Sequence, residues 1–279
     1  MQTASRLSVS IVLHNSAQEL LQKTLSSLDR AAALALSEGL LDGVAVVLID
    51  NASAGAYLDQ LKAQVAGLPL GSLELAWLPQ RDNRGFGAGH NLALAQVHSD
   101  YHLVLNPDVE LATDALCAGL RALDGRADVA LLCPGATGSD GAPAYLCKRY
   151  PSLLVLLLRG FAPRFLQRLF KGALERYQVR DIIDAGEPAE VEIASGCFML
   201  LRTPDLAALG GFDEGYFLYF EDFDLSLRLR EQGRGALLYW PEMRIVHHGG
   251  DAARKGLDHV RYFLRSARRF FGTHGWRFL

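Results

Sequence analysis

Short apolar runs alternate with longer segments of helical periodicity over the first half of the chain. The runs have the length and composition of buried strands, and we expect strands over residues 7–13, 44–49, 73–78, 101–105 and 129–133. After the first run, leucine and alanine recur every three or four residues, which predicts a helix over residues 17–36. Ser16 precedes that helix and Glu19 follows three residues later, the spacing of a capping box. The alternation is typical of βαβ units, so we predict an α/β fold with a mainly parallel sheet.

The second half of the chain is less regular. A glycine-rich stretch covers residues 135–141, and the segment after it carries no strand pattern until about residue 180. Thr203, Pro204 and Asp205 have the order of a helix cap, a first-turn proline and a first-turn acid. The other elements expected here are strands over residues 191–202, 236–240 and 244–246 and helices over residues 223–232 and 256–271. No repeat or low-complexity linker interrupts the sequence, so we expect a single domain over residues 1–279.

Polar residues follow two of the predicted strands. Asp50 and Asn51 come directly after one, and Asn106, Pro107 and Asp108 come after another. In an open parallel sheet, ligands bind at the carboxyl ends of the strands, because the crossover loops converge there. We therefore expect the functional site at this edge of the sheet.

Composition narrows the class of function. The 279 residues are 50% hydrophobic and 21% charged, and 28 Lys and Arg against 31 Asp and Glu give a net charge of -3. Such a chain is neither disordered nor a general nucleic-acid binder. The four cysteines have no metal-ligand or disulfide-scaffold spacing, so we expect buried thiols in a reducing compartment. We expect no export signal and no membrane span, because the apolar runs at residues 7–13 and 153–158 are far shorter than the ~20 residues a span requires.

Glycines stand at positions 85, 87 and 89 of the segment from Asn83 to Asn91, ahead of a predicted helix. The segment is not a dinucleotide fingerprint, since His90 occupies the third glycine position of GxGxxG. Glycines before a helix let backbone N–H groups approach a phosphate or ribose closely. A tight turn is an equal alternative for this segment taken alone.

Two places offer metal ligands. Asp108 lies just past an apolar strand and could hold Mg²⁺ or Mn²⁺ through its oxygens, although Asn-Pro-Asp more often caps the next element. His247 and His248 precede two glycines, where an imidazole could ligate a metal or face a phosphate. An inert pair of surface histidines is the alternative.

Three acids, Glu221, Asp222 and Asp224, stand among aromatic residues at a predicted helix start. The helix dipole stabilises acids there and explains one or two of them without any catalysis. A carboxylate beside aromatic rings also loses solvation, which raises its pKa and makes it a better general base for a sugar hydroxyl. The structural and the catalytic interpretation both stay open on this segment alone.

Two stretches are basic and amphipathic. Residues 148–180 contain eight Lys or Arg and one acid, Glu175, and residues 256–279 combine five arginines with aromatic residues. Such segments can lie in the interface of an anionic membrane, whereas a solvated helix face is the alternative. Two of them in one chain support the hypothesis of a peripheral membrane contact.

Taken in order over about residues 8–250, these motifs resemble GT-A-fold glycosyltransferases of family 2, particularly the bacterial branch of rhamnosyltransferases. The matching segments are residues 9–15, 47–53, 83–91, 105–108, 195–197, 210–213 and 221–222, followed by His248. The chain departs from the family's metal-binding DxD motif at Asn106, which replaces the first acid.

The resemblance implies a GT-A fold with a helical acceptor-side extension. Residues 1–135 would bind the nucleotide sugar, and residues 136–279 would hold the acceptor and the catalytic base. Asp222 would be that base, with Glu221 as the runner-up, and Asp108 and His248 would hold Mg²⁺ or Mn²⁺. The residues implied for nucleotide binding are Asn15, Asp50, Asn51, Asn83, Gly85, Phe86, Gly87, Asn91 and Asn106.

The resemblance also implies an activity. We expect an inverting, metal-assisted glycosyltransferase that moves a sugar from a nucleoside-diphosphate donor, dTDP-L-rhamnose first among them, to a bacterial surface polysaccharide or a lipid-linked glycan precursor. A UDP donor of galactofuranose, hexose or amino sugar is an alternative, and so is a non-catalytic subunit that binds nucleotide sugar or glycan. The expected location is the cytoplasm at the inner face of the cytoplasmic membrane, with no nucleic-acid partner.

Overall fold

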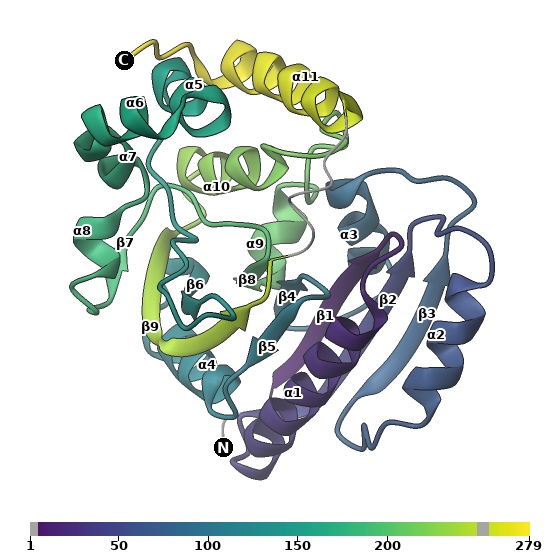
Figure 1. Ribbon diagram of the computed structural model, residues 1–279. Coiled ribbons are helices and arrows are strands. Elements are labelled where there is room, and N and C mark those ends of the chain that lie inside the picture. Colours follow the sequence, from purple (N-terminus) through teal and green to yellow (C-terminus); the bar gives the residue numbers. More distant parts are fainter. Residues whose placement is uncertain (1–4, 250–256) are drawn as a thin grey trace.

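The computed structural model describes residues 5–249 and 257–279 and contains one sheet of nine strands between layers of helices (Figure 1). The predicted α/β class is confirmed. The strands are β1 (Ser5–Leu13), β2 (Leu41–Asp50), β3 (Glu74–Pro79), β4 (Tyr101–Leu105), β5 (Val109–Leu111), β6 (Val129–Thr137), β7 (Ala189–Glu190), β8 (Phe198–Arg202) and β9 (Ala236–His247).

The sheet order is β3-β2-β1-β4-β8-β6-β9-β5, and β7 also pairs with β9. Strands β3, β2, β1 and β4 run parallel to one another, and β6 runs parallel to β9. Strand β8 is antiparallel to both of its neighbours, and β5 and β7 are antiparallel to β9. The carboxyl ends of β1, β2 and β4 therefore meet at one edge, where the sequence predicts the site.

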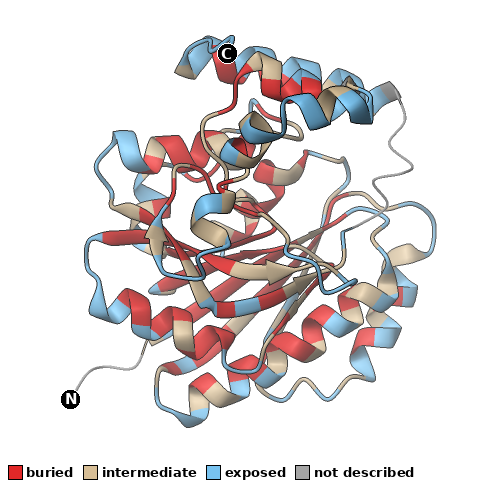
Figure 2. Cartoon of the chain, turned by 60° about the vertical axis from the view of Figure 1, so that its left-hand side comes forward, coloured by how far each residue is buried: buried red, intermediate tan, exposed pale blue. Residues whose placement is uncertain are grey.

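Helices cover both faces of the sheet, and most of the strand residues between them are buried (Figure 2). α1 and α4 pack together against one face, whereas α3 packs against β1 and β2 and contacts α10. The helices are α1 (Gln18–Ser37), α2 (Tyr57–Ala66), α3 (Phe86–Leu94), α4 (Ala115–Gly125), α5 (Leu153–Phe161), α6 (Arg164–Leu169), α7 (Lys171–Tyr177), α8 (Arg180–Ile183), α9 (Thr203–Ala208), α10 (Glu221–Glu231) and α11 (Leu257–His274).

Two apolar clusters hold these layers together. The larger joins the sheet to α1 and α4; Leu21, Leu25, Leu28 and Ala32 of the predicted stripe of α1 are fully buried in it, and Leu36 is partly buried. The second cluster packs α11 on α10 through aromatic rings such as Phe220, Phe270 and Phe271. Burial of each such side chain stabilises the fold by about 1.5–3 kcal/mol, so the C-terminal helix is firmly attached to α10.

Helices α5 to α8 and α11 gather at the end of the molecule beside α10 (Figure 1). The C-terminal segment is tied to α5, because the N–H groups of Leu153 and Leu154 donate to the carbonyls of Arg277 and Phe278 at 2.8 and 3.2 Å. The segment that shows no strand pattern in the sequence is helical from Leu153 to Ile183, in α5 to α8, whereas Pro143 and Lys148 before it make isolated β-bridges.

Several expectations at the level of elements are wrong. Ser16 does not cap α1: the helix begins after Ala17, and the Ser16 hydroxyl accepts the His14 N–H instead. Thr203 is the first residue of α9 and not its cap, and its hydroxyl bonds to Ser99 at 3.0 Å.

Of the strand expected over residues 191–202, only β8 (Phe198–Arg202) forms; β7 ends before it at Glu190, and residues 191–197 form a loop in which Ile193 makes one isolated bridge to Lys148. Conversely, residues 236–240 and 244–246 form one strand, β9, with an irregularity where it bends past Pro241. Gly256, the expected start of the last helix, and Gly250 lie outside the described residues. All four cysteines are buried free thiols, as expected.

Among residues 5–249 and 257–279, no helix combines the length and apolar character that crossing a membrane requires.

Candidate active site

Residues at the end of β2 and just past β1 form one side of the candidate site. Asp50 is only 5% exposed, and its Oδ1 accepts the Ser53 N–H at 3.3 Å. Asn15, just past β1, has a left-handed φ of 51°, and its Oδ1 accepts the Ala54 N–H at 2.9 Å. The two side chains implied for nucleotide binding therefore also fix the loop that follows β2.

Asn51 connects this loop to the glycine-rich segment. Its Nδ2 donates to Asn83 Oδ1 at 2.8 Å and to the Gly85 carbonyl at 3.0 Å, and its Oδ1 accepts the Arg84 N–H at 3.0 Å. Asn83 Oδ1 also accepts the Gly85 N–H at 2.9 Å. Asn51 is 2% exposed, so these bonds orient the segment from within.

Position 85 requires glycine for two reasons, its backbone conformation and the lack of space for a side chain. Its φ is +89°, and a Cβ there would lie 2.2 Å from the Phe217 carbonyl oxygen, to which the Phe86 N–H donates at 3.0 Å. The N–H groups of Gly85 and Phe86 are thus already bonded within the protein. The tight-turn interpretation holds for these two positions, and their contact with a phosphate stays a prediction.

The rest of the segment packs on the loop before α10. Asn91 Nδ2 donates to the Phe212 carbonyl at 2.9 Å, and its Oδ1 accepts the Phe212 N–H at 2.8 Å. A Cβ on Gly87 would lie 2.8 Å from Phe212. The Phe86 ring faces Gly196, close enough that a Cβ there would be 3.0 Å away. In the structure Asn91 therefore joins the two halves of the site.

The turn after β4 carries the predicted metal ligand. Asp108 is 8% exposed, and its Oδ1 lies 3.5 Å from His247 Nε2. His248 Nε2 instead lies 2.7 Å from Glu110 Oε1, although its N–H donates to the Asp108 carbonyl at 3.0 Å. Pairing of Val109 with His247 between β5 and β9 produces this arrangement, which the sequence could not reveal. The imidazole beside Asp108 is thus His247.

The chemistry of these donors fits a hard divalent cation. A carboxylate at Asp108, an amide at Asn106 and an imidazole at His247 are all groups that Mg²⁺ or Mn²⁺ accepts. Within the described part of the chain, no three His, Cys, Asp or Glu side chains gather as a complete site. Such a cation would need further oxygens from a bound diphosphate or from water, the usual situation for Mg²⁺.

Glu221 and Asp222 open α10 after two strained residues. Tyr219 and Phe220 have φ of 72° and 67°, a conformation that bulky residues rarely adopt outside functional sites. Asp222 Oδ2 accepts the Gly196 N–H at 2.8 Å, and its Oδ1 accepts the Phe223 N–H at 3.0 Å. Both carboxylate oxygens are therefore held in a defined orientation.

The two carboxyls have raised pKa values. Burial raises the pKa of Asp222, although the N–H groups of Gly196 and Phe223 act in the opposite direction. Burial raises the pKa of Glu221 well above its usual range, and the charge of Asp222 raises it further. Glu221 Oε2 is buried and has no hydrogen-bond partner among the described residues. Asp222 is thus suited to carry charge, and Glu221 to stay protonated.

Asp224, the third acid, has a structural role. Its Oδ2 lies 2.6 Å from Arg228 Nε, and its Oδ1 lies 2.9 Å from His274 Nε2 on α11. It is 1% exposed and connects α10 to the C-terminal helix.

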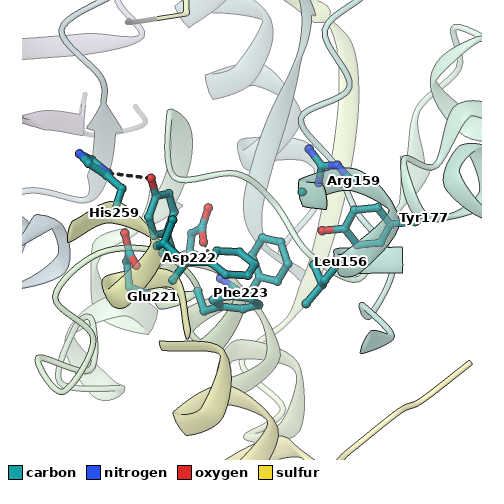
Figure 3. Close-up of a pocket in the computed structure, with 12 residues that line it drawn as sticks. Leu156, Arg159, Tyr177, Glu221, Asp222, Phe223 and His259 are labelled. Atoms are coloured by element: carbon teal, nitrogen blue, oxygen red, sulfur yellow. Dashed lines mark hydrogen bonds between the residues drawn. The ribbon is translucent and has the colours of Figure 1, made fainter. Parts of the chain in front are cut away.

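A cavity of about 450 Å³ lies in front of Asp222 (Figure 3). Glu221, Asp222 and Phe223 lie on one side of it, and Arg159 and Tyr177 lie on the other. Arg159 stacks 5.3 Å from the centre of the Tyr177 ring, and burial raises the pKa of Tyr177 to about 12. On the side of Glu221, away from Arg159, the Tyr219 hydroxyl forms a hydrogen bond with His259 Nδ1 at 2.9 Å.

Sequence reasoning missed Arg159, Tyr177 and Lys148 as site residues. Burial lowers the pKa of Lys148 to about 8, and its ammonium donates to the carbonyls of Tyr145 and Cys147. Its positive charge also favours the ionised form of Asp222. The excess of cations over residues 148–180 was the signal in the sequence that could have pointed to these residues.

Comparison with known proteins identifies a family and relatives that the chain resembles. The model of glycosyl transferase family 2 matches residues 8–205. Rhamnosyltransferase WbbL of Escherichia coli K12 is 29% identical over 195 residues, which cover 67% of this chain and 69% of that protein. An N-acetylglucosaminyl-diphospho-decaprenol L-rhamnosyltransferase of Mycobacterium tuberculosis is 29% identical over 253 residues, 84% of this chain and 76% of that protein.

Solved structures share the fold at low identity. GalNAc-T7 with UDP, GalNAc and Mn²⁺ superposes with a TM-score of 0.63 and 16% identity, over 97% of this chain but only 50% of that one. The mannosyltransferase PcManGT of Pyrobaculum calidifontis, in complex with GDP-Man and Mn²⁺, has a TM-score of 0.58 and 17% identity, over 96% of this chain and 62% of that one. These likenesses show the GT-A fold. Because the family model matches more than half of its residues, the chain belongs to glycosyl transferase family 2.

Proposed function

We propose that the protein is an inverting glycosyltransferase that moves a sugar, L-rhamnose from dTDP-L-rhamnose in the first instance, to a glycan on a lipid diphosphate. The observation that carries the proposal is Asp222, a buried carboxylate oriented by two N–H groups toward a cavity. The rhamnosyltransferase names of the two relatives support the donor, and the diphospho-decaprenol in one name supports the acceptor.

The reaction is one displacement. Asp222 takes the proton from the acceptor hydroxyl as that oxygen forms a bond to the anomeric carbon of the donor. The bond from that carbon to the diphosphate breaks, and the nucleoside diphosphate leaves with the electron pair. Attack from the side opposite the leaving group inverts the anomeric configuration. The raised pKa of Asp222 supports its role as base at neutral pH.

On the donor side, residues 1–135 form the nucleotide half and residues 136–279 the acceptor half of a single domain. Asp50 and the loop held by Asn15, Asn51 and Asn83 receive the base and ribose at the carboxyl edge of the sheet. Gly85, Phe86, Gly87 and Asn91 form the back of this wall.

Asp108, with Asn106 and His247, would hold Mg²⁺ or Mn²⁺. Mn²⁺ in the two structural neighbours and the donor chemistry of these side chains support this assignment. His247 replaces His248 as the imidazole nearest Asp108, and His248 supports the turn through Glu110. When bound, the cation would neutralise charge on the departing diphosphate.

The protein works at the inner face of the cytoplasmic membrane through its basic helices. Flotation with liposomes tests this: the chain should rise with vesicles that contain anionic lipid and stay behind with neutral ones. Absence from both fractions would contradict the membrane contact.

A transfer assay on the full chain tests the function. N-acetylglucosamine on a short-chain lipid diphosphate is offered with dTDP-L-rhamnose and, in parallel, with UDP-hexose, UDP-galactofuranose and UDP-amino sugar. We expect one product with inverted anomeric configuration by NMR, formed from the dTDP donor and lost in Asp222→Asn. Transfer from a UDP donor alone would replace the proposed donor, and no transfer from any donor would favour a binding subunit.

A further inference from the structure

Large exposed apolar side chains occur on one part of the described molecule only. Their exposed fractions run from 37% to 94%, and all of them lie on α5, α6, the α6–α7 junction, α11 or the C-terminal segment. They are Leu157, Phe165, Leu169, Phe170, Val260, Leu264, Trp276, Phe278 and Leu279. Large apolar side chains that gather on one part of a protein surface mark a binding site for an apolar ligand or surface.

The catalytic cavity lies between the helices that carry these side chains. α5 contributes Leu156, Arg159 and Gly160 to its lining, and α11 contributes His259, Val260 and Phe263. Val260 is itself one of the exposed apolar residues, so the apolar surface continues into the cavity. A hydrocarbon chain could therefore follow α5 and α11 from the surface to the cavity that holds Asp222.

Charge divides this cavity into two ends. Asp222, which carries the charge beside a protonated Glu221, makes one end acidic, and Arg159 is the only lysine or arginine among the described residues that line the cavity. Arg159 pairs with no carboxylate in the described part of the chain, and its guanidinium lies against Tyr177. An anion that enters the cavity is thus repelled from the acidic end and attracted to Arg159.

A second, basic cavity of about 460 Å³ shares Arg159 with the first. Its cations include Arg164 and Arg168, which form no ion pair among residues 5–249 and 257–279. Glu175 is the only acid in its lining, and it already lies 3.5 Å from Lys171 and 3.6 Å from Arg180. The excess positive charge next to Arg159 matches an anion with more than one negative charge.

We propose that Arg159, supported by Arg164 and Arg168, binds the diphosphate of an isoprenoid-diphosphate acceptor, whose hydrocarbon chain lies between α5 and α11. This deepens the proposed function and rests on it. The sugar of such an acceptor is attached directly to the diphosphate, so binding of the diphosphate at Arg159 points the sugar across the cavity toward Asp222. Arginine suits this role because its planar guanidinium binds phosphate oxygens through two hydrogen bonds.

Binding of farnesyl diphosphate, measured by calorimetry on the full chain without nucleotide or metal, tests the proposal. Farnesol and inorganic pyrophosphate are the comparison ligands. We expect farnesyl diphosphate to bind at least about tenfold more tightly than either, because only it engages both the cations and the apolar groove. If pyrophosphate binds as tightly as farnesyl diphosphate, the apolar groove does not contribute to binding. If farnesol binds as tightly, the arginines do not contribute. Either result would overturn the proposal.

Variants of Arg159 test whether this residue binds the diphosphate. Arg159→Gln should weaken farnesyl diphosphate binding at least about tenfold, and Arg159→Lys should restore part of it. Arg30→Gln, a matched change of an exposed arginine on α1, should leave it unchanged. Thermal unfolding of each variant checks that the fold persists. An unaltered affinity in a folded Arg159→Gln protein would overturn the proposal.

Kinetic measurements distinguish a failure of the Arg159 site from a failure of the proposed glycosyltransferase activity. With the donor fixed, Arg159→Gln should raise KM for the sugar on a lipid diphosphate about tenfold and change KM for the same sugar as an octyl glycoside little. An equal rise for both acceptors would contradict diphosphate recognition. Because farnesyl diphosphate binding needs no donor, a protein that binds it through Arg159 but transfers no sugar would refute the proposed function; Arg159 would still be a diphosphate-binding residue, but not part of an acceptor site.

Discussion

At the scale of single residues, the proposed catalysis depends on the surroundings of Asp222. Two backbone N–H groups orient its carboxylate, burial raises its pKa, and Lys148 opposes that rise. Glu221 differs, since it is more strongly desolvated and one of its oxygens has no partner among the described residues. The sequence placed both acids at a helix start beside aromatic rings but could not rank them, because the ranking depends on Gly196, 26 positions away along the chain.

Asp222→Asn should lower kcat on the order of 10²- to 10⁴-fold, because the amide cannot take a proton from the acceptor. Its Oδ1 can still accept one N–H, so the fold and donor affinity should persist. Steady-state kinetics and thermal unfolding measure these effects. Glu221→Gln is the matched control, and a larger loss of kcat in that variant would make Glu221 the base.

The pH profile of kcat/KM should have an acidic limb set by Asp222. The base acts when deprotonated, and burial raises its pKa above 3.8, so activity should rise with pH through a midpoint above that value. Initial rates between pH 4 and 8 measure it. Lys148→Met should move the midpoint upward, because the charge of Lys148 favours ionised Asp222. A downward movement would contradict this electrostatic assignment.

Among the elements, the strands and helices with a clear local pattern were predicted, whereas α2, α4 and the breaks within strands were not. The buried runs of β1, β2 and β4 and the stripe of α1 follow from local periodicity. The bend that joins the two expected late strands into β9 depends on pairing with β6, which local sequence does not contain. The same pairing brings His247 rather than His248 to Asp108.

Gly85→Ala should lower the free energy of unfolding by about 2–3 kcal/mol, since it adds a clash with the Phe217 carbonyl to the strain of a positive φ. Gly39→Ala is the matched control, because Gly39 has a φ of +69° and nothing within 4 Å of an added Cβ. Denaturant unfolding compares the two. Equal losses would mean that the contact between the glycine-rich segment and residue 217 contributes nothing.

At the scale of the whole molecule, a row of hydrogen-bonded polar side chains lies buried in the core. His102 lies between the hydroxyls of Ser8 and Ser10 on β1 at 2.7 and 2.8 Å, and Ser10 also bonds to His90 at 2.6 Å. Burial lowers the pKa of His102 to about 4 and that of His90 well below its usual range. The sequence leaves both histidines unassigned, because only the assembled sheet and α3 show that they are buried together.

Stability should therefore fall as the solution is acidified. Both histidines are neutral in the folded chain but take up protons in the unfolded chain below about pH 6.5, so the stability they contribute is complete above that pH. For His102 it is lost progressively down to about pH 4, by about 3 kcal/mol in all. Urea unfolding at pH 7.5 and pH 5 measures it. His102→Gln should show a shallower dependence, and His98→Gln, an exposed control, should match the wild type.

Thermal unfolding with dTDP, UDP or GDP, each with and without Mn²⁺, shows whether the carboxyl edge of this sheet binds a nucleoside diphosphate together with a divalent cation. At ~100 times its dissociation constant, a ligand stabilises the folded chain by about 2.7 kcal/mol, which is several degrees for a chain of this size. We predict a Mn²⁺-dependent rise in Tm with dTDP that Asp108→Ala abolishes. If none of the three nucleotides shifts Tm, this edge of the sheet is not a nucleotide site and the proposed transfer reaction is wrong.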